Sequence, residues 1–406
     1  MPLIKEIRKA VSESIDYRKD LSDEDVREII ADIVFEKSKQ TYMSMELRHE
    51  IIEVVFNAMR RLDILQPVIE DESVTEIMVN GPDNIFIERN GRTSRLNIQF
   101  ESIEKLEDAI QSIVSRVNRT VNEAVPIVDA RLQDGSRVNV VLPPVALNGP
   151  IMTIRKFPEK PMTFGQLIEY GSITEEVAEV LERMVKARYN IFICGGTGSG
   201  KTTFLNALSN FIPAGERIIT IEDSAELQIK GIENIVRMET RNANTEGRGE
   251  ITIRELIKTS LRMRPERIIV GEVRGPEALD MLQAMNTGHD GSLSTGHANS
   301  AADMASRLET MVLSGASLPL EAVRKQIASA IDIMIHLARL RDKSRRVLEI
   351  SEVIGFRDGE VQFNPLFVFE EEGETKEKQI IGNLKRTKNE MIHIQKFRMS
   401  GISDHV

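Results

Sequence analysis

The sequence predicts an α/β protein whose main domain contains a largely parallel β-sheet. Strand-like apolar runs alternate with amphipathic helical stretches over residues 163–340, which is the pattern of a parallel α/β sheet. Within this stretch, the apolar run 191–194 leads into a glycine-rich loop and then into a helix. Residues 66–157 instead alternate apolar and polar side chains, which predicts a separate α+β domain of hairpins and one helix.

Length and composition favour a multidomain globular protein, because 406 residues exceed the size of one compact core. We predict a helical bundle over 1–65, an α+β domain over 66–157, a nucleotide-binding domain over 158–370 and a polar tail over 371–406. No apolar run reaches the roughly eighteen residues that span a membrane, and the N-terminus is unlike a signal peptide. We therefore expect a cytoplasmic protein that meets the membrane only through partners.

Charge and residue usage narrow the class of partner. The net charge of −10, the aromatic content of 4% and the lack of Trp argue against a nucleic-acid-binding surface. The single cysteine, Cys194, excludes an intrachain disulfide and a cysteine-cluster zinc site. Because Cys194 lies inside a predicted strand, we expect it to be a small buried apolar residue.

The first hundred residues predict helices and then strands. Helical spacing of apolar residues begins after Ser22 and at Ser44, and the sequence leaves open whether these helices are structural or bind a partner. A strand over 74–80 precedes a hairpin of 85–89 with 93–100, whose turn is Asn90-Gly91. A helix over 103–117 follows.

A second hairpin, turning at Asp134-Gly135, carries two arginines on one face. Arg131 and Arg137 alternate with aliphatic residues, so that they point to the same side of neighbouring strands. Taken alone, this pattern favours an ordinary solvated surface. An exit strand that ends near Arg155 and a proline-rich linker at Pro158 and Pro161 then lead to the next domain.

The glycine-rich loop matches the full Walker A pattern in the required order of strand, loop and helix. Its backbone N–H groups and the following helix N-terminus favour bound phosphate. Lys201 would reach the β- and γ-phosphates, and the Thr202 hydroxyl would bind Mg²⁺. The predicted nucleotide-binding residues are Gly195, Gly196, Thr197, Gly198, Ser199, Gly200, Lys201, Thr202 and Thr203.

Three further predicted strands end in polar residues. The strand 217–221 is followed by Glu222 and Glu226, the strand 268–270 by Glu272, and the strand 292–295 by His297. Ligands bind at the carboxyl ends of strands in parallel sheets, so we expect these side chains to surround the nucleotide.

Their chemistry suits ATP hydrolysis. Glu272 occupies the position of a Walker B acid and would hold Mg²⁺ or orient the attacking water, although Gly271 replaces the usual aspartate before it. Glu222 or Glu226 could polarise the water, and His297 could contact the γ-phosphate. Whether His289 is functional or structural stays open. Candidate cations are Arg262, Arg264 and Arg274 near the third strand, and Arg131, Arg137 and Arg155 in the preceding domain.

Four blocks together resemble the type II/type IV secretion ATPase superfamily. They match its Walker A, Asp box (220–226), Gly-Glu Walker B (262–274) and His box (288–297), in that order. Upstream, Glu76-Ile-Met-Val-Asn-Gly81 and 128–137 look like the tight-adherence (Tad/Flp) pilus ATPases of CpaF type. The four-cysteine zinc motif of many extension ATPases and the Ala-Ile-Arg-Asn-Leu-Ile motif of retraction motors are both missing, which favours the CpaF-type interpretation.

This resemblance implies a PAS-like domain, a RecA-like motor domain and a homo-hexameric ring. It implies that ATP binds between the two domains, with Arg131, Arg137 and Arg155 of the first domain near the phosphates, which overrides the solvated-surface interpretation. It also implies an inner-membrane platform protein as partner. A conjugation or type IV secretion ring ATPase, a non-hydrolysing nucleotide-dependent scaffold and a GTPase-like switch remain alternatives, although the guanine-specifying Asn-Lys-x-Asp element is missing.

Overall fold

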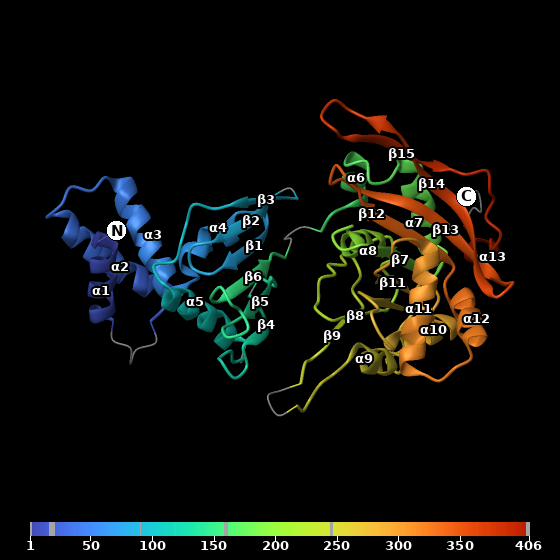
Figure 1. Cartoon of the computed structure of the whole chain (residues 1–406), viewed down its shortest axis with the longest axis horizontal. Helices are drawn as coiled ribbons and strands as arrows, with labels where there is room; N and C mark the ends of the chain where they lie inside the picture. Colours follow the sequence, from blue (N-terminus) through green and yellow to red (C-terminus); the bar gives the residue numbers. More distant parts are fainter. Residues whose placement is uncertain are drawn as a thin grey trace. The chain divides into compact units, whose positions relative to one another are not determined.

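The computed structural model describes residues 2–15, 21–89, 91–117, 119–132, 134–157, 161–243 and 247–402. The chain divides into two compact units, Met1–Glu159 and Lys160–Val406, which are described separately (Figure 1). Asn90 of the first predicted turn and Pro158 of the predicted linker lie outside the described residues. Within the described residues, no helix is both long and apolar enough to cross a membrane.

The first unit begins with a small helical bundle. Ser22 and Ser44 cap α2 and α3, because their hydroxyls accept hydrogen bonds from the N–H groups of Asp25 and Leu47. Buried Ile7, Val26, Ile30 and Phe56, among others, form the core of this bundle. The helices are α1 (Pro2–Ser14), α2 (Asp23–Ser38), α3 (Met45–Arg60) and α4 (Gln66–Glu70), with a 3₁₀ turn at Asp63–Leu65 before α4.

The rest of the first unit is a six-stranded antiparallel sheet in the order β3-β2-β1-β6-β5-β4. Helix α5 (Ile103–Arg116) buries Leu106, Ile110 and Ile113 in the same core as the sheet. Strand β3 ends at Arg95 and is shorter than the predicted strand 93–100. The strands are β1 (Val74–Asn80), β2 (Ile85–Arg89), β3 (Arg92–Arg95), β4 (Ile127–Arg131), β5 (Arg137–Val141) and β6 (Ile151–Arg155).

The second unit is built on a nine-stranded sheet in the order β15-β14-β13-β12-β7-β11-β10-β8-β9. From β12 to β9 all neighbours are parallel, and from β12 to β15 they are antiparallel. Strand β9 was not expected from the sequence. The strands are β7 (Ile191–Gly195), β8 (Ile218–Glu222), β9 (Ile235–Glu239), β10 (Arg267–Val270), β11 (Leu293–Gly296), β12 (Ile333–Arg339), β13 (Arg345–Arg357), β14 (Glu360–Glu374) and β15 (Ile380–Arg386).

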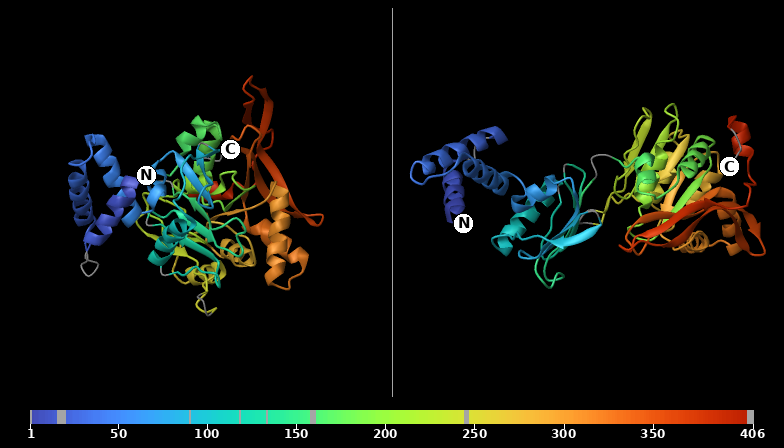
Figure 2. Two further views of the ribbon diagram at one scale, coloured as in Figure 1. Left: turned by 60° about the vertical axis from the view of Figure 1, so that its left-hand side comes forward. Right: turned by 90° about the horizontal axis from the view of Figure 1, so that it is seen from above.

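Helices cover both faces of this sheet (Figure 1, Figure 2). Strand β7 shows why both faces are buried: Ile191 and Ile193 belong to one hydrophobic core, whereas Phe192 and Cys194 belong to the other. This arrangement confirms the predicted α/β fold class. The helices are α6 (Phe164–Glu169), α7 (Glu175–Lys186), α8 (Lys201–Ser209), α9 (Ile253–Ser260), α10 (Glu277–Asn286), α11 (Ala301–Gly315), α12 (Leu320–Ala330) and α13 (Gln395–Ser400).

The C-terminal region differs from the separate polar tail that was predicted over 371–406. Strand β14 continues through this boundary to Glu374, and β15 pairs with β14. Phe397 of α13 is fully buried and stacks near Tyr189, with the ring centroids 4.8 Å apart. The apolar residues of this region are sparse and pack against distant parts of the chain. The sequence pattern therefore did not predict these strands and this helix.

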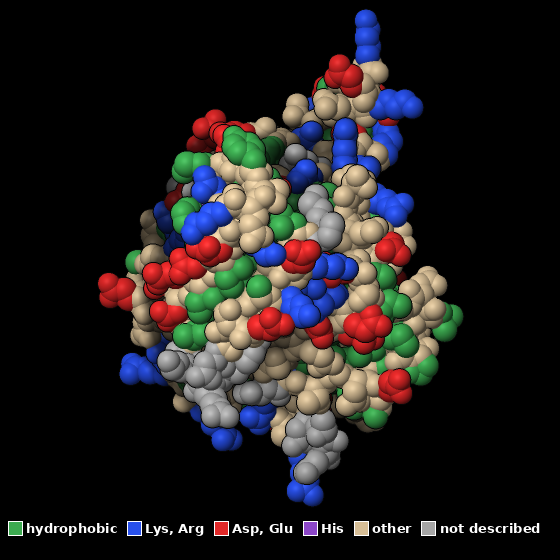
Figure 3. Space-filling model, turned by 90° about the vertical axis from the view of Figure 1, so that its left-hand side faces the viewer, with side chains coloured by type: hydrophobic (Ala, Val, Ile, Leu, Met, Phe, Trp, Pro, Cys, Tyr) green, Lys and Arg blue, Asp and Glu red, His purple; other side chains and the backbone are tan. Residues whose placement is uncertain are grey.

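Charged side chains of both signs are intermixed on the face of the molecule in Figure 3. This distribution gives no support on that face to a broad basic surface of the kind that binds nucleic acid.

Candidate nucleotide-binding and catalytic site

The loop between β7 and α8 has the backbone geometry that a phosphate-binding loop requires. Gly198 and Gly200 adopt positive φ angles of 73° and 93°, which glycine accepts without strain. A Cβ atom at Gly195 would lie 2.3 Å from the carbonyl oxygen of Leu337 on the neighbouring strand β12. These positions therefore need glycine because of local conformation and close packing.

The side chains of this loop place polar groups where phosphate is expected. Lys201 is buried, and its Nζ lies 3.1 Å from the carbonyl oxygen of Gly196. Thr202 is half-buried in the first turn of α8, and Thr203 beside it is exposed. The buried Ser199 Oγ has no hydrogen-bond partner among the described residues. The loop thus combines a buried cation with a polar atom that is free to bind.

The parallel pairing brings the predicted catalytic residues to the same edge of the sheet as this loop. In the register of the sheet, Ile221 lies beside Val270, Val270 beside Ser294, and Gly296 beside Cys194. Glu222, Glu272 and His297 stand at or just after the carboxyl ends of these strands. Packing of parallel strands therefore gathers residues that are far apart in the sequence.

His297 lies between the loop lysine and the Walker B glutamate. Its Nδ1 is 3.3 Å from Lys201 Nζ, and its Nε2 is 2.8 Å from Glu272 Oε1. Because an ammonium group only donates and a carboxylate only accepts, these neighbours select the tautomer with the proton on Nε2. Burial lowers the pKa of His297, and nearby cations including Lys201 act in the same direction while Glu272 opposes them. The arrangement therefore favours a neutral histidine at pH 7.

One carboxylate oxygen of Glu272 is available to bind a ligand. Its Oε2 accepts a hydrogen bond of 2.6 Å from Arg274, whose side chain also lies 3.9 Å from Asp223. Its buried Oε1 is near His297 but accepts no well-aligned hydrogen bond from the described residues. This oxygen can therefore accept a water molecule or bind a metal ion.

Glu222 is a second carboxylate of unusual character. One oxygen, Oε2, accepts hydrogen bonds from the N–H groups of Glu226 at 2.7 Å and Leu227 at 3.0 Å. The other, Oε1, is buried without a partner among the described residues. Burial raises the pKa of Glu222 to about 7. A Cβ atom at Gly271 would lie 2.9 Å from Glu222 Cγ, so the Glu222 side chain fills the space beside the usual aspartate position.

The candidate arginines fall into three groups. Arg274 contacts Glu272 directly. Arg262 and Arg264 lie between α9 and the amino end of β10, whereas Glu272 follows the carboxyl end of the same strand. The structure therefore does not bring these two arginines to the loop of the same chain. Arg131, Arg137 and Arg155 lie side by side across β4, β5 and β6, since Arg137 pairs in register with both of the others.

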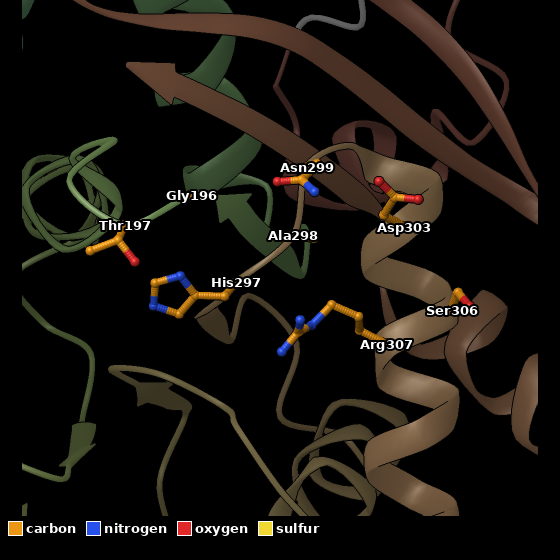
Figure 4. Close-up of a pocket in the computed structure, with 8 residues that line it drawn as sticks. All are labelled: Gly196, Thr197, His297, Ala298, Asn299, Asp303, Ser306 and Arg307. Carbon is orange, nitrogen blue, oxygen red and sulfur yellow. The ribbon is translucent and has the colours of Figure 1, made fainter. Parts of the chain in front are cut away.

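Two further basic residues were not expected from the sequence. The Arg345 Nε, on β13, donates a hydrogen bond of 2.9 Å to the Gly198 carbonyl in the loop. Arg307, on α11, lines a cavity of about 500 Å³ beside Thr197 and His297 (Figure 4). No local pattern marks either arginine, because both reach the loop through tertiary packing. His289 precedes the amino end of β11, away from the loop, and its Nδ1 lies 3.1 Å from the Ala284 carbonyl oxygen. This contact indicates a structural role.

These residues fit a nucleoside triphosphate and Mg²⁺. Thr202 and the open oxygen of Glu272 are oxygen ligands, which Mg²⁺ prefers. The described residues contain no group of three or more His, Cys, Asp or Glu side chains that could hold a metal by themselves. An ion here would depend on the nucleotide phosphates and water for its other ligands, as is usual for Mg²⁺.

Most of the chain matches one known protein family. Residues 59–396 match the family model described as type II/IV secretion system protein. A Mycobacterium tuberculosis protein named for conjugal transfer is 36% identical over 305 residues, covering 74% of this chain and 86% of the relative. The type IV secretion system protein PtlH of Bordetella pertussis is 32% identical over 325 residues, covering 73% of this chain and 94% of the relative.

Solved structures support the fold. The pilus retraction motor PilT with bound ADP is 20% identical with a TM-score of 0.53, covering 73% of this chain and 84% of PilT. The Legionella pneumophila ATPase DotB is 22% identical with a TM-score of 0.51, covering 72% of this chain and 80% of DotB. The predicted RecA-like fold of the motor domain is confirmed. The chain belongs to the type II/IV secretion system protein family.

Proposed function

We propose that this protein is a hexameric motor that uses ATP hydrolysis to drive pilus assembly or protein secretion. The contact series from Lys201 through His297 to Glu272 carries this proposal. It links the group that binds the transferred phosphate to the group that prepares the attacking water. A site that only held nucleotide would need the glycine loop and lysine but not this series.

The chain's own residues account for the main requirements of hydrolysis. Lys201 stabilises charge on the β- and γ-phosphates, and Glu272 orients water toward the γ-phosphorus. Neutral His297 lies against the Glu272 carboxylate, with its Nε2 2.8 Å from Oε1, and so restricts the positions that this carboxylate can take. Glu222, with a pKa of about 7, can accept or return a proton near neutral pH. Mg²⁺, held by Thr202 and Glu272, would neutralise charge on the phosphate oxygens.

Cationic assistance comes from arginines in this proposal. The row of Arg131, Arg137 and Arg155 stabilises the charge that develops on the phosphates, as an arginine finger does. Arg274 positions Glu272 through their direct contact. Arg262 lies near the amino ends of the parallel strands, and we propose that it acts across a subunit boundary.

We propose that this motor serves a pilus of the tight-adherence type. Support comes from the upstream motifs 76–81 and 128–137 and from the N-terminal helices. The motor would bind the inner face of the cytoplasmic membrane through a platform protein, because the described residues supply no membrane-spanning helix. Conformational changes during the ATP cycle would then act on the platform.

A conjugation or type IV secretion ring ATPase is the second candidate function. The M. tuberculosis relative and PtlH favour it, because their names refer to conjugal transfer and type IV secretion. Both functions use the same nucleotide site. Neighbouring genes discriminate between them: pilin and platform genes indicate the pilus motor, whereas a conjugation or effector operon indicates the alternative.

The decisive experiment measures ATPase activity per subunit against protein concentration, with the mass of the assembly recorded in the same samples. We expect activity to rise as hexamers form. Glu272→Gln should bind ATP but lose at least about a hundredfold in turnover, and Arg137→Ala should behave similarly because a transition-state charge is lost.

Matched controls use residues of the same kind outside the site. Arg92→Ala changes an exposed arginine on β3, the edge strand on the opposite side of the first sheet from β4. Glu321→Gln changes an exposed carboxylate on α12. Both should hydrolyse ATP normally. Full activity of a monomer would refute the ring mechanism, and absence of hydrolysis by assembled wild-type protein would favour the nucleotide-dependent scaffold.

A further inference from the structure

A cavity lies on the side of the phosphate loop that faces α11. Its volume is about 500 Å³, and its walls include Thr197, His297, Asn299, Ser306 and Arg307. The Asp303, Ser306 and Arg307 side chains are exposed, so the cavity is open to solvent. It therefore joins the expected position of the γ-phosphate to the surface of the second unit.

Arg307 is the main charged group that enters this cavity. Figure 4 shows its guanidinium group extending toward His297, whereas the carboxylate of Asp303, one helical turn earlier, points elsewhere. Among the described residues, Arg307 has no hydrogen bond or ion pair, although Arg254 and Arg324 on α9 and α12 pair with carboxylates at 2.7 and 2.8 Å. Its charge is one of those that lower the pKa of His297.

The lining of the cavity suits a small anion. A guanidinium group offers several N–H donors in one plane, which matches the oxygens of phosphate. The hydroxyls of Thr197 and Ser306 and the side-chain amide of Asn299 supply further donors. Asp303 is the one acidic side chain in the lining, and it points away from Arg307.

We propose that this cavity is the exit subsite for inorganic phosphate, and that Arg307 binds the ion as it leaves. This inference rests on the proposed ATP hydrolysis. The oxygen of water bonds to the γ-phosphorus, and the bond from that phosphorus to the bridging oxygen of ADP breaks. Phosphate keeps one proton of the water and the other is released. ADP still occupies the loop, so phosphate leaves on the side of His297 and Arg307.

The test measures binding of inorganic phosphate to the full-length, ADP-bound protein by calorimetry, with ATP hydrolysis measured in parallel. We expect Arg307→Gln to weaken phosphate binding about tenfold, the typical effect of losing one charge-assisted contact. Arg307→Lys should retain most of the affinity because it retains the charge. Affinity for ADP itself should change less than about twofold, because ADP is held mainly by the loop.

Two controls separate local from general electrostatic effects. Asp303→Asn removes the acidic group of the same cavity and should leave phosphate binding unchanged or tighter. Lys325→Gln removes an exposed positive charge on α12, outside the cavity, and should leave phosphate binding and hydrolysis unchanged.

Each remaining outcome identifies what has failed. Equal phosphate affinity in wild type and Arg307→Gln, with normal wild-type hydrolysis, would overturn the exit subsite and leave the motor function intact. A loss of hexamer mass in Arg307→Gln would show that Arg307 is a contact between subunits, which also overturns it. Lack of hydrolysis by the wild type would overturn the proposed function.

Discussion

At the scale of single residues, the pair of Gly271 and Glu222 shows how this site departs from the common Walker B arrangement. The Glu222 side chain fills the space that a side chain at 271 would need. One of its oxygens is held by two backbone N–H groups and the other is buried without a partner among the described residues. This carboxylate is therefore fixed in position but incompletely satisfied, which suits a group that exchanges protons.

The raised pKa of Glu222 predicts a pH-dependent stability. The pKa rises from 4.5 to about 7 on folding, so the folded state binds the proton more tightly than the unfolded chain. Stability should therefore fall as pH rises from about 4.5 to about 7 and stay level above this range. Glu222→Gln removes this penalty, so urea denaturation at pH 8 should give it a free energy of unfolding higher than that of wild type by on the order of 3 kcal/mol.

At pH 5 the difference between Glu222→Gln and wild type should shrink to about a quarter of its value at pH 8, because the folded protein keeps Glu222 mostly protonated and the unfolded chain is only partly ionised. Glu233→Gln, an exposed carboxylate of the same unit, serves as control and should follow wild type at both pH values. Identical pH profiles for wild type and Glu222→Gln would contradict the assignment.

The position of His297 predicts which substitutions the site tolerates. A glutamine offers an N–H toward Glu272 and an oxygen toward Lys201, as the neutral imidazole offers Nε2–H and Nδ1, whereas a leucine offers neither. We expect His297→Leu to lower kcat by about a hundredfold and His297→Gln to lower it much less, with ATP affinity retained in both. Steady-state kinetics with parallel nucleotide-binding measurements test this. Equal losses in the two variants would mean that the histidine acts through shape alone.

At the scale of secondary-structure elements, the C-terminal segment completes the second unit. The buried carboxylate of Glu352 on β13 accepts hydrogen bonds from the N–H groups of Ile392 and His393. Lys396 on α13 contacts Asp290 and Asp332, both at 2.7 Å. Asp332 also accepts a hydrogen bond from the Asn190 N–H, just before β7. The segment is therefore tied to the strand that leads into the phosphate loop.

Loss of the Lys396 cation should destabilise this unit. Lys396→Met keeps an apolar stem but leaves two carboxylates without the lysine cation. We expect the free energy of unfolding, measured by thermal unfolding at pH 8, to fall by about 1–3 kcal/mol. Burial already raises the pKa of Asp332, so protonation should reduce the loss at pH 5. Lys388→Met, at an exposed position of the same segment, should have little effect. Equal unfolding temperatures of Lys396→Met and wild type would show that the contact contributes nothing.

At the scale of the whole molecule, the proposed ring makes the source of the arginines testable. The family resemblance implies that Arg137 serves the nucleotide of its own subunit. Mixed rings of Glu272→Gln and Arg137→Ala subunits should then stay inactive, because every site lacks one required group. Recovery of ATPase activity on mixing would show instead that the arginine acts on a neighbouring subunit. Mass measurement of the mixed rings confirms that the two variants have assembled together.

The sequence by itself determined the features that depend on adjacent residues or on regular strand order. The glycine loop is contiguous, so the one stretch 195–203 contains both the glycines that its backbone conformation requires and the side chains that bind phosphate and Mg²⁺. Glu222, Glu272 and His297 were also predicted to meet, because parallel strands align their carboxyl ends. The row of Arg131 and Arg137 followed from the alternation of a hairpin.

Only the tertiary structure decided the features that depend on contacts between distant segments. The strand order brings Arg345 to the loop, α11 brings Arg307 beside His297, and β14, β15 and α13 turn the predicted tail into part of the sheet and core. No short-range pattern encodes these neighbours. Their positions follow from burial of apolar surface across the whole second unit, which no local stretch of sequence specifies.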